Sequence, residues 1–157
     1  MVSGFQWYYA AIEFCRKDHR LQIQMRKGLL TLEKTNDMIQ IDKILEKEQT
    51  NMDRIFVYVL HGRFMALGYS AYYVALLCPK LEITWSRTDA SDPFVCICIP
   101  EDCLHSFSPK YPTLVDDENI CIAPPLNICR QRDSFAQWQE RQLHFSPEID
   151  IEQTNNQ

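Results

Sequence analysis

The residues most able to do chemistry lie in one short segment, which begins at Tyr111 and ends at Cys121. Pro112 restricts the backbone near the start of this segment, and the polar residues 116–119 predict a turn in its middle. A short extended piece, residues 120–122, follows the turn. A thiol presented beyond a rigid polar turn can act as a nucleophile. At an ordinary pKa of about 8.5, enough of it is ionised at neutral pH for thioester exchange.

Cys121 also fits a simpler interpretation. It stands between Ile120 and Ile122, so it could equally be a buried and inert residue of a short strand. Catalysis needs an exposed thiol and a polar group that stabilises an oxyanion. His105 is the histidine nearest to the segment, but an ordinary surface histidine fits that position as well. Both interpretations of Cys121 stay open at the level of sequence.

Other cysteines invite comparison with a zinc site, because thiolate and imidazole are ligands that zinc favours. Zinc sites usually place two ligands around a tight turn, and Pro100 interrupts the run in question. We therefore expect no metal and expect the two strand cysteines of this run to be buried structural residues. Two arginines follow Cys129 closely, so its thiol is a candidate for a lowered pKa. The run compared with a zinc site consists of Cys96, Cys98, Cys103 and His105.

The composition is that of an acidic, folded, single-domain protein. The chain has 157 residues, of which 46% are hydrophobic and 24% charged, and its net charge is −5. The negative charge and the absence of Lys/Arg runs argue against nucleic-acid binding. The chain has only four glycines, and none are clustered into a phosphate-binding loop, so no nucleotide cofactor is expected.

The seven cysteines bear on the cellular compartment. Their number is odd and the N-terminus lacks the pattern of a secretory signal, so we expect reduced thiols in the cytoplasm. The most apolar stretch, residues 55–79, is interrupted by Arg63. A charge in the middle of a membrane span is costly, so this stretch predicts buried strands and no contact with a membrane.

Hydrophobic periodicity and β-branched runs predict helices towards both ends of the chain and antiparallel strands between them. The many prolines after residue 99 predict an ordered but irregular loop, and the residues after 146 predict a frayed tail. This order of elements predicts an α+β fold in one domain, 1–157, with a helical segment at 4–50, the sheet and thiol loop at 54–130, a helix at 133–145 and the tail at 146–157. The predicted helices are 4–35, 37–49 and 133–145, and the predicted strands are 55–60 with an extension at 64–67 past a bulge, 71–77, 83–85 and 94–99.

The segment from Tyr111 to Cys121 resembles the active-site segment of ubiquitin-conjugating enzymes, in which a His-Pro-Asn tripeptide precedes the catalytic cysteine. Tyr111 stands at the histidine position, Pro112 matches the proline and Thr113 stands at the asparagine position. Residues 120–122 match the hydrophobic-Cys-hydrophobic core, and residues 92–95 are similar to the family's Pro-Pro-x-Val motif. The resemblance extends over residues 50 to 145, but only residues 111–121 are specific. The interval before Tyr111 is longer than in typical eukaryotic members, and divergent bacterial members are similar in this respect.

The resemblance implies a ubiquitin-conjugating-like fold, an antiparallel meander sheet flanked by helices, and a transferase activity. Cys121 would carry the C-terminus of a protein as a thioester and pass it to an amine. Thr113 and the hydroxyl of Tyr111 would stabilise the oxyanion, and Asp117, or its neighbours Asp116 and Glu118, would orient or deprotonate the incoming lysine. The implied partners are an acyl-donor protein, an activating enzyme and, as in bacterial relatives that act in anti-phage defence, a nucleotide cyclase.

Two alternatives remain beside this hypothesis. One is a non-catalytic binding module of the same fold, which the replacement of asparagine by Thr113 favours and the retention of Cys121 disfavours. The other is an unrelated small α+β protein in which the segment matches by chance. Fold likeness alone does not decide between them, because one fold can support many functions.

Overall fold

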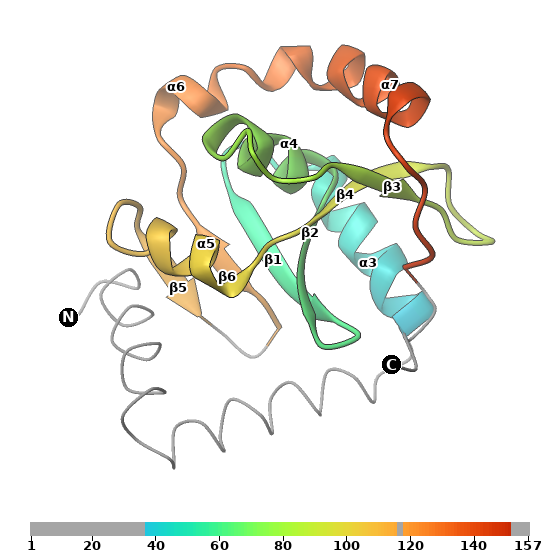
Figure 1. The fold of residues 1–157 in the computed structure, drawn as a ribbon, viewed down its shortest axis with the longest axis horizontal. Coiled ribbons are helices and arrows are strands. Elements are labelled where there is room, and N and C mark those ends of the chain that lie inside the picture. The colour runs from blue at the N-terminus through green and yellow to red at the C-terminus, as the bar shows by residue number, and fades with distance from the viewer. Residues whose placement is uncertain (1–36, 116–117, 152–157) are drawn as a thin grey trace.

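The computed structural model describes residues 37–115 and 118–151 (Figure 1). Within them, six antiparallel strands form one sheet in the order β3-β4-β2-β1-β6-β5, and helices flank it, which confirms the α+β class. The strands are β1 (Ile55–Leu60), β2 (Arg63–Leu67), β3 (Thr84–Ser86), β4 (Phe94–Cys98), β5 (Thr113–Val115) and β6 (Ile120–Ile122). The helices are α3 (Asp37–Gln49), α4 (Gly68–Leu77), α5 (Glu101–Phe107), α6 (Leu126–Cys129) and α7 (Phe135–Phe145), with the 3-10 helix η1 (Arg132–Ser134) before α7.

Several elements lie where the sequence predicts them. The predicted helix 37–49 is α3, the predicted strands 55–60 and 94–99 are β1 and β4, and the predicted C-terminal helix is α7. The short strand predicted at 83–85 is β3, shifted by one residue. The predicted N-terminal helix 4–35 lies outside the described residues.

The strand order is not the meander that the resemblance implies. Three hairpins, β1–β2, β3–β4 and β5–β6, are joined so that β4 lies beside β2 and β6 lies beside β1. Helices intervene between successive hairpins, α4 between β2 and β3 and α5 between β4 and β5. These helical connections carry the chain across the sheet, whereas the tight turns of a meander would leave consecutive strands side by side.

The turn between β1 and β2 is tighter than predicted. His61 has φ of 52° and Gly62 has φ of 73°, so both central residues are in the left-handed region that a two-residue type I′ turn requires. Leu60 pairs with Arg63 across this turn. Residues 64–67 therefore belong to a second, antiparallel strand, and the predicted extension of β1 past a bulge is wrong.

Helix α4 replaces the strand predicted at 71–77. This segment is apolar on nearly every side, and a short apolar run does not by itself distinguish a buried strand from a buried helix. Gly68 begins the helix with φ of 58°, a conformation that lets the chain leave β2 sharply. The helix then packs against β1, β2 and β4, where its uniformly apolar surface is buried.

Helix α5 replaces part of the predicted irregular loop. Pro100 precedes the helix, and Glu101 and Asp102 in the first turn favour its N-terminus electrostatically. The prolines that predict a loop therefore mark the boundaries of a short helix. His105 lies in this helix, with its Nε2 atom 3.6 Å from Oε1 of Glu101.

Residues 147–151 are ordered against the sheet, so the predicted frayed tail is wrong there. Glu148 forms a parallel bridge with Trp85 of β3, and the Ile149 amide donates a hydrogen bond of 2.8 Å to the Trp85 carbonyl. The Trp85 indole donates to the Ser146 carbonyl at 2.9 Å. Ile151 is only 1% exposed. Residues 152–157 of the predicted tail lie outside the described residues.

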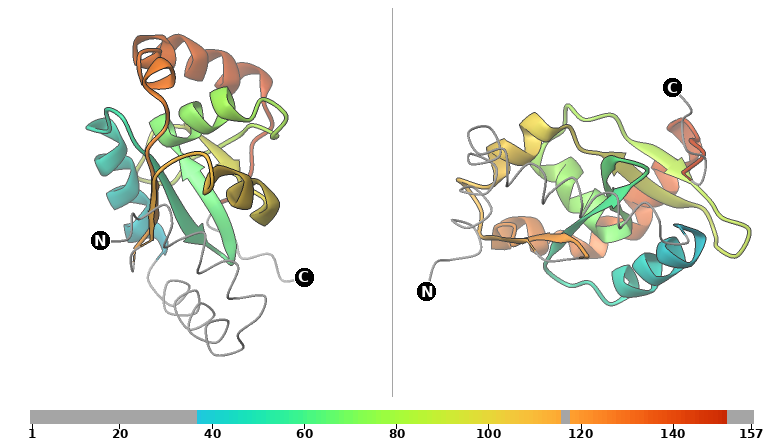
Figure 2. Two further views of the ribbon diagram at one scale, coloured as in Figure 1. Left: turned by 90° about the vertical axis from the view of Figure 1, so that its left-hand side faces the viewer. Right: turned by 90° about the horizontal axis from the view of Figure 1, so that it is seen from below.

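Two hydrophobic cores lie on opposite faces of the sheet. Because side chains alternate along a strand, Ile55 and Val57 of β1 face the core under α4, α5 and α7, whereas Tyr58 and Leu60 face the other way. The second core is closed by α3, which contributes Ile41 and Ile44, and by Ile151. Figure 2 shows α3 across the sheet from α5.

We expect Ile151→Ala to lower the free energy of unfolding by about 2–4 kcal/mol, because it leaves a cavity in the second core. Ile149→Ala is a matched control, since Ile149 is only partly buried and its loss should cost less. Chemical denaturation of the two variants measures the difference. Equal and negligible effects would show that this segment does not contribute to the core.

Candidate functional site

Cys121 is the middle residue of β6. It pairs with Phe56 of β1 and with Leu114 of β5. Ile120 and Ile122 face the core under α4, so the Cys121 side chain points to the opposite face of the sheet. The residue is half-buried, and its neighbour Leu114 is 56% exposed. The extended piece predicted at 120–122 is β6, and the thiol in its middle is neither deeply buried nor fully exposed.

Thr113 and Tyr111 lie across the sheet from Cys121. Thr113 pairs with Ile122, so it shares the face of Ile122 and is 2% exposed. Its hydroxyl donates a hydrogen bond of 2.9 Å to the Tyr111 carbonyl. The Tyr111 ring packs against the core, 6.1 Å from the Phe107 ring centroid. The structure thus brings Tyr111 and Thr113 together and places the Thr113 side chain on the face of the sheet opposite to the Cys121 side chain.

Of the three acids predicted to orient or deprotonate the incoming lysine, the structure describes only Glu118. Asp117 and Asp116 lie outside the described residues, and Glu118 is exposed on the segment that leads into β6. Asn119, which follows it, is buried.

The remaining cysteines differ from their predictions in two respects. Cys96 is buried as predicted, and burial raises the pKa of its thiol to about 11, but Cys98 is exposed. Cys129 is not a low-pKa thiol: burial raises its pKa and Asp53 adds to the effect, while Arg54 opposes it. Within residues 37–115 and 118–151, no group of three His, Cys, Asp or Glu side chains is arranged to hold a metal ion.

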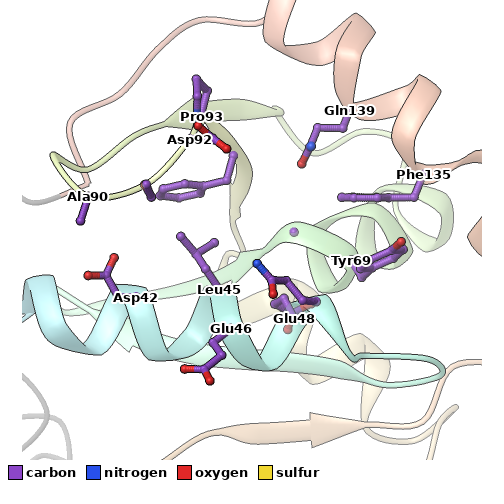
Figure 3. A pocket seen from close by; sticks show the side chains of 14 residues that line it. Asp42, Leu45, Glu46, Glu48, Tyr69, Ala90, Asp92, Pro93, Phe135 and Gln139 are labelled. Carbon is purple, nitrogen blue, oxygen red and sulfur yellow. The ribbon is translucent and has the colours of Figure 1, made fainter.

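A groove that the sequence did not predict lies between α3, the start of α4, the loop before β4 and α7 (Figure 3). Its volume is about 420 Å³, within the range typical of ligand sites. We call it the α3–α7 groove. It is lined by Asp42, Leu45, Glu46, Glu48, Gln49, Gly68, Tyr69, Ala90, Ser91, Asp92, Pro93, Phe94, Phe135 and Gln139.

The lining of the α3–α7 groove is acidic and aromatic. Four of its residues are carboxylic acids, and none of the fourteen is Lys, Arg or His. Figure 3 shows Asp42 and Leu45 on α3, and Asp92 across from them on the loop before β4. Tyr69 and Phe135 stack with their ring centroids 3.9 Å apart, and the Arg132 guanidinium lies 4.2 Å from the Tyr69 centroid. An aromatic surface that already contacts one cation borders the groove.

Glu48 is the buried acid of the groove, and it is held in a polar network. Its Oε1 accepts hydrogen bonds from the Ser70 amide at 2.8 Å and from Asn51 Nδ2 at 3.1 Å. Its Oε2 accepts from the Ser70 hydroxyl at 2.7 Å. Burial raises the pKa of Glu48 to about 7, although the hydrogen bonds from Ser70 and Asn51 oppose this shift. The carboxyl therefore changes charge near neutral pH.

A signal for Glu48 was present in the sequence. Ile41, Ile44 and Glu48 follow one another at helical spacing, so the acid lies on the same face of α3 as the two buried isoleucines. The charged residues of an amphipathic helix usually form a solvated surface, but Glu48 is only 3% exposed. An acid at an apolar position of a helix is a specific indication of a buried polar network.

No protein-family model, no curated protein and no solved structure matches this chain. Its function therefore has to be inferred from its own geometry. Over residues 37–115 and 118–151, no helix combines the length and the apolar character that crossing a bilayer requires.

The raised pKa of Glu48 predicts a specific dependence of stability on pH. The folded protein holds the proton more tightly than the unfolded chain, whose carboxyl has its ordinary value near 4.5. The free energy of unfolding should therefore fall as the pH rises from about 4.5 to about 7, by roughly 3 kcal/mol from this group, and stay level above. We expect Glu48→Gln to remove that part of the slope, because an amide imitates the neutral acid.

Urea denaturation of both proteins between pH 5 and pH 8 measures this difference. Glu46→Gln is the control, since Glu46 is exposed on the same helix and its variant should keep the slope of the original chain. Parallel curves for Glu48→Gln and the original chain would contradict the prediction.

Proposed function

We propose that this chain is a non-catalytic binding module, and that the α3–α7 groove takes a cationic segment of a protein partner. The observation that carries the proposal is the lining of the groove, which combines four acids with three aromatic rings and has no basic side chain. Lys and Arg side chains join an apolar stem to a charged head, so they match an apolar floor with an acidic rim. The aromatic rings of the groove are those of Tyr69, Phe94 and Phe135.

Long-range electrostatics support the same partner chemistry. The whole chain carries a net charge of −5, which attracts basic segments and repels acidic ones. Arg132 already lies 4.2 Å from the Tyr69 centroid, so one ring that borders the groove holds a guanidinium.

Glu48 links binding to pH. A cation that enters the groove favours the ionised form of this carboxyl and so lowers its pKa from about 7. Binding near neutral pH should therefore release part of a proton, and the affinity for a cationic ligand should rise between pH 6 and pH 8.

The proposal predicts that two rim acids contribute to affinity. We expect the double variant Asp42→Asn, Asp92→Asn to bind a labelled peptide rich in Arg and Leu about five- to tenfold more weakly, because each partly screened charge contributes modestly. A peptide of the same length with Glu in place of Arg should bind at least as poorly to either protein. Fluorescence anisotropy at low and at high salt measures the affinity of the original chain and of the double variant for each peptide.

Asp89→Asn is the matched control, because Asp89 is an exposed acid of the same loop that does not line the groove. Its variant should bind as the original chain does. Equal affinity for the Arg and Glu peptides, or an equal loss in the Asp89 variant, would contradict the proposal.

A second candidate is cysteine-dependent acyl transfer of the ubiquitin-conjugating kind. One observation favours it: Cys121 is only half-buried and lies beside the exposed Leu114. The oxyanion donor would have to be a group other than Thr113, since the Thr113 side chain lies on the opposite face of the sheet. The sheet, with α4 inserted between β2 and β3, would then be a divergent form of that family's fold.

Trapping with a thioester donor separates the two candidates. Acyl transfer predicts that Cys121→Ser forms a stable ester with a ubiquitin-like donor protein loaded on its activating enzyme, and that Thr113→Val leaves this reaction unchanged. Mass spectrometry detects the adduct, with Cys96→Ser, altered at a buried thiol, as the control for the background. The binding module predicts no adduct together with unchanged affinity of Cys121→Ser for the Arg peptide.

A further inference from the structure

The positive and negative charges of this chain are distributed unevenly along its sequence. Residues 1–36, which lie outside the described residues, contain six Lys or Arg and three Asp or Glu, so their net charge is +3. Because the whole chain carries −5, residues 37–157 carry −8. The cationic part of the sequence leads directly into α3, the helix that supplies one wall of the acidic α3–α7 groove. Opposite charges on two parts of one chain attract each other, so the groove has a potential ligand in the same molecule.

One stretch of the cationic part has a composition that complements the groove. Residues 20–30, with the sequence Arg-Leu-Gln-Ile-Gln-Met-Arg-Lys-Gly-Leu-Leu, contain three basic side chains, five apolar side chains and no acid. The groove is lined by four carboxylic acids and three aromatic rings, and none of its residues is Lys, Arg or His. Basic side chains with apolar stems, next to aliphatic side chains, match a lining of this kind.

The groove is within reach of this stretch. Lys27 is ten residues before Asp37, the first residue of α3, so the connecting chain spans about 15 Å if it is helical and up to about 33 Å if it is extended. The α3 residues that line the groove run from Asp42 to Gln49, roughly 8 Å to 18 Å from the start of the helix along its axis. Either conformation of the connection lets residues 20–30 reach the groove when the chain reverses direction before α3.

We infer that residues 20–30 occupy the α3–α7 groove of their own chain and that a cationic partner binds by displacing them. This inference rests on the proposed function, because it names the occupant of the same groove when no partner is bound. The groove volume of about 420 Å³ is that of a site for a single ligand, so the tethered segment and the partner compete.

The tether determines how strong this competition is. A segment on a short linker is present at an effective concentration of the order of millimolar. A contact between the segment and the groove with a Kd of about 0.1–0.5 mM would therefore weaken the binding of a separate peptide about three- to tenfold. A weak contact within the chain is thus enough to regulate the groove.

The test measures the affinity of the full-length chain for a labelled synthetic peptide of residues 20–30 by fluorescence anisotropy. The triple variant Arg20→Gln, Arg26→Gln, Lys27→Gln removes the charges of the tethered segment. It should bind the free peptide about three- to tenfold more tightly than the original chain does. Because the expected result is a gain in affinity, misfolding of the variant cannot imitate it.

The rim acids connect this gain to the groove. Adding Asp42→Asn and Asp92→Asn to the original chain and to the triple variant should weaken peptide binding to both and bring the two affinities together. A gain in affinity of the same size without these two acids would overturn the inference, because the segment would then be masking a different site.

The variant Arg16→Gln, Lys17→Gln, Lys34→Gln is the matched control, because it removes the same number of charges from the N-terminal part but leaves residues 20–30 intact. It should bind the peptide as the original chain does. Equal affinity of the original chain and of the first triple variant, with binding still dependent on the rim acids, would overturn the inference and leave the proposed function intact. A peptide that binds neither protein would overturn both.

A zero-length cross-link measures the contact directly. A carbodiimide joins a lysine amine to a carboxylate as an amide and takes up the water that is lost. In a dilute solution of the original chain, mass spectrometry should find Lys27 joined to Asp42, Glu46 or Asp92, and excess free peptide should reduce the yield of this product. Cross-links from Lys27 only to acids outside the groove would contradict the inference.

Discussion

A buried carboxyl group connects the main elements of this protein. Glu48 reaches from α3 to the first turn of α4, where it accepts hydrogen bonds from both the amide and the hydroxyl of Ser70. The same hydroxyl oxygen accepts the Phe56 amide of β1 at 2.9 Å, so one serine joins two helices and the sheet. Asn51 completes the network through the Arg54 backbone. Polar groups buried to this degree are tolerated only when they are paired in this way.

The close approach of α3 to α4 depends on Gly68. A Cβ atom at this position would lie 3.2 Å from Cβ of Glu48, and the backbone there has φ of 58°. Glycine relieves both constraints, so the chain can leave β2 and begin α4 directly against α3. This approach also forms one wall of the α3–α7 groove. Folding favours the neutral form of Glu48. A cation bound in the groove, as proposed above, would favour the ionised form and would therefore compete with the proton for this carboxyl group.

The sequence predicted elements with a clear periodicity and missed those without one. Helix α3 has polar and apolar faces, β1 has β-branched residues, and both were predictable. Helix α4 has no polar face, so its pattern could not be told from that of a strand. The relative placement of the candidate site residues could not be predicted for another reason. Thr113 is close to Cys121 in sequence, but the register of β5 with β6 places their side chains on opposite faces of the sheet. The spacing of residues in a motif does not reveal the strand register.

The segment that ends at Ile151 has a consequence for solubility. β3 is an end strand of the sheet, and its outer edge is occupied by residues 147–149 through the Trp85 contacts. An uncovered strand edge offers unpaired amides and carbonyls to other molecules, and it is a common starting point for aggregation. This short segment therefore shields the β3 edge of the sheet from self-association, and Ile151 holds it in place through the second core.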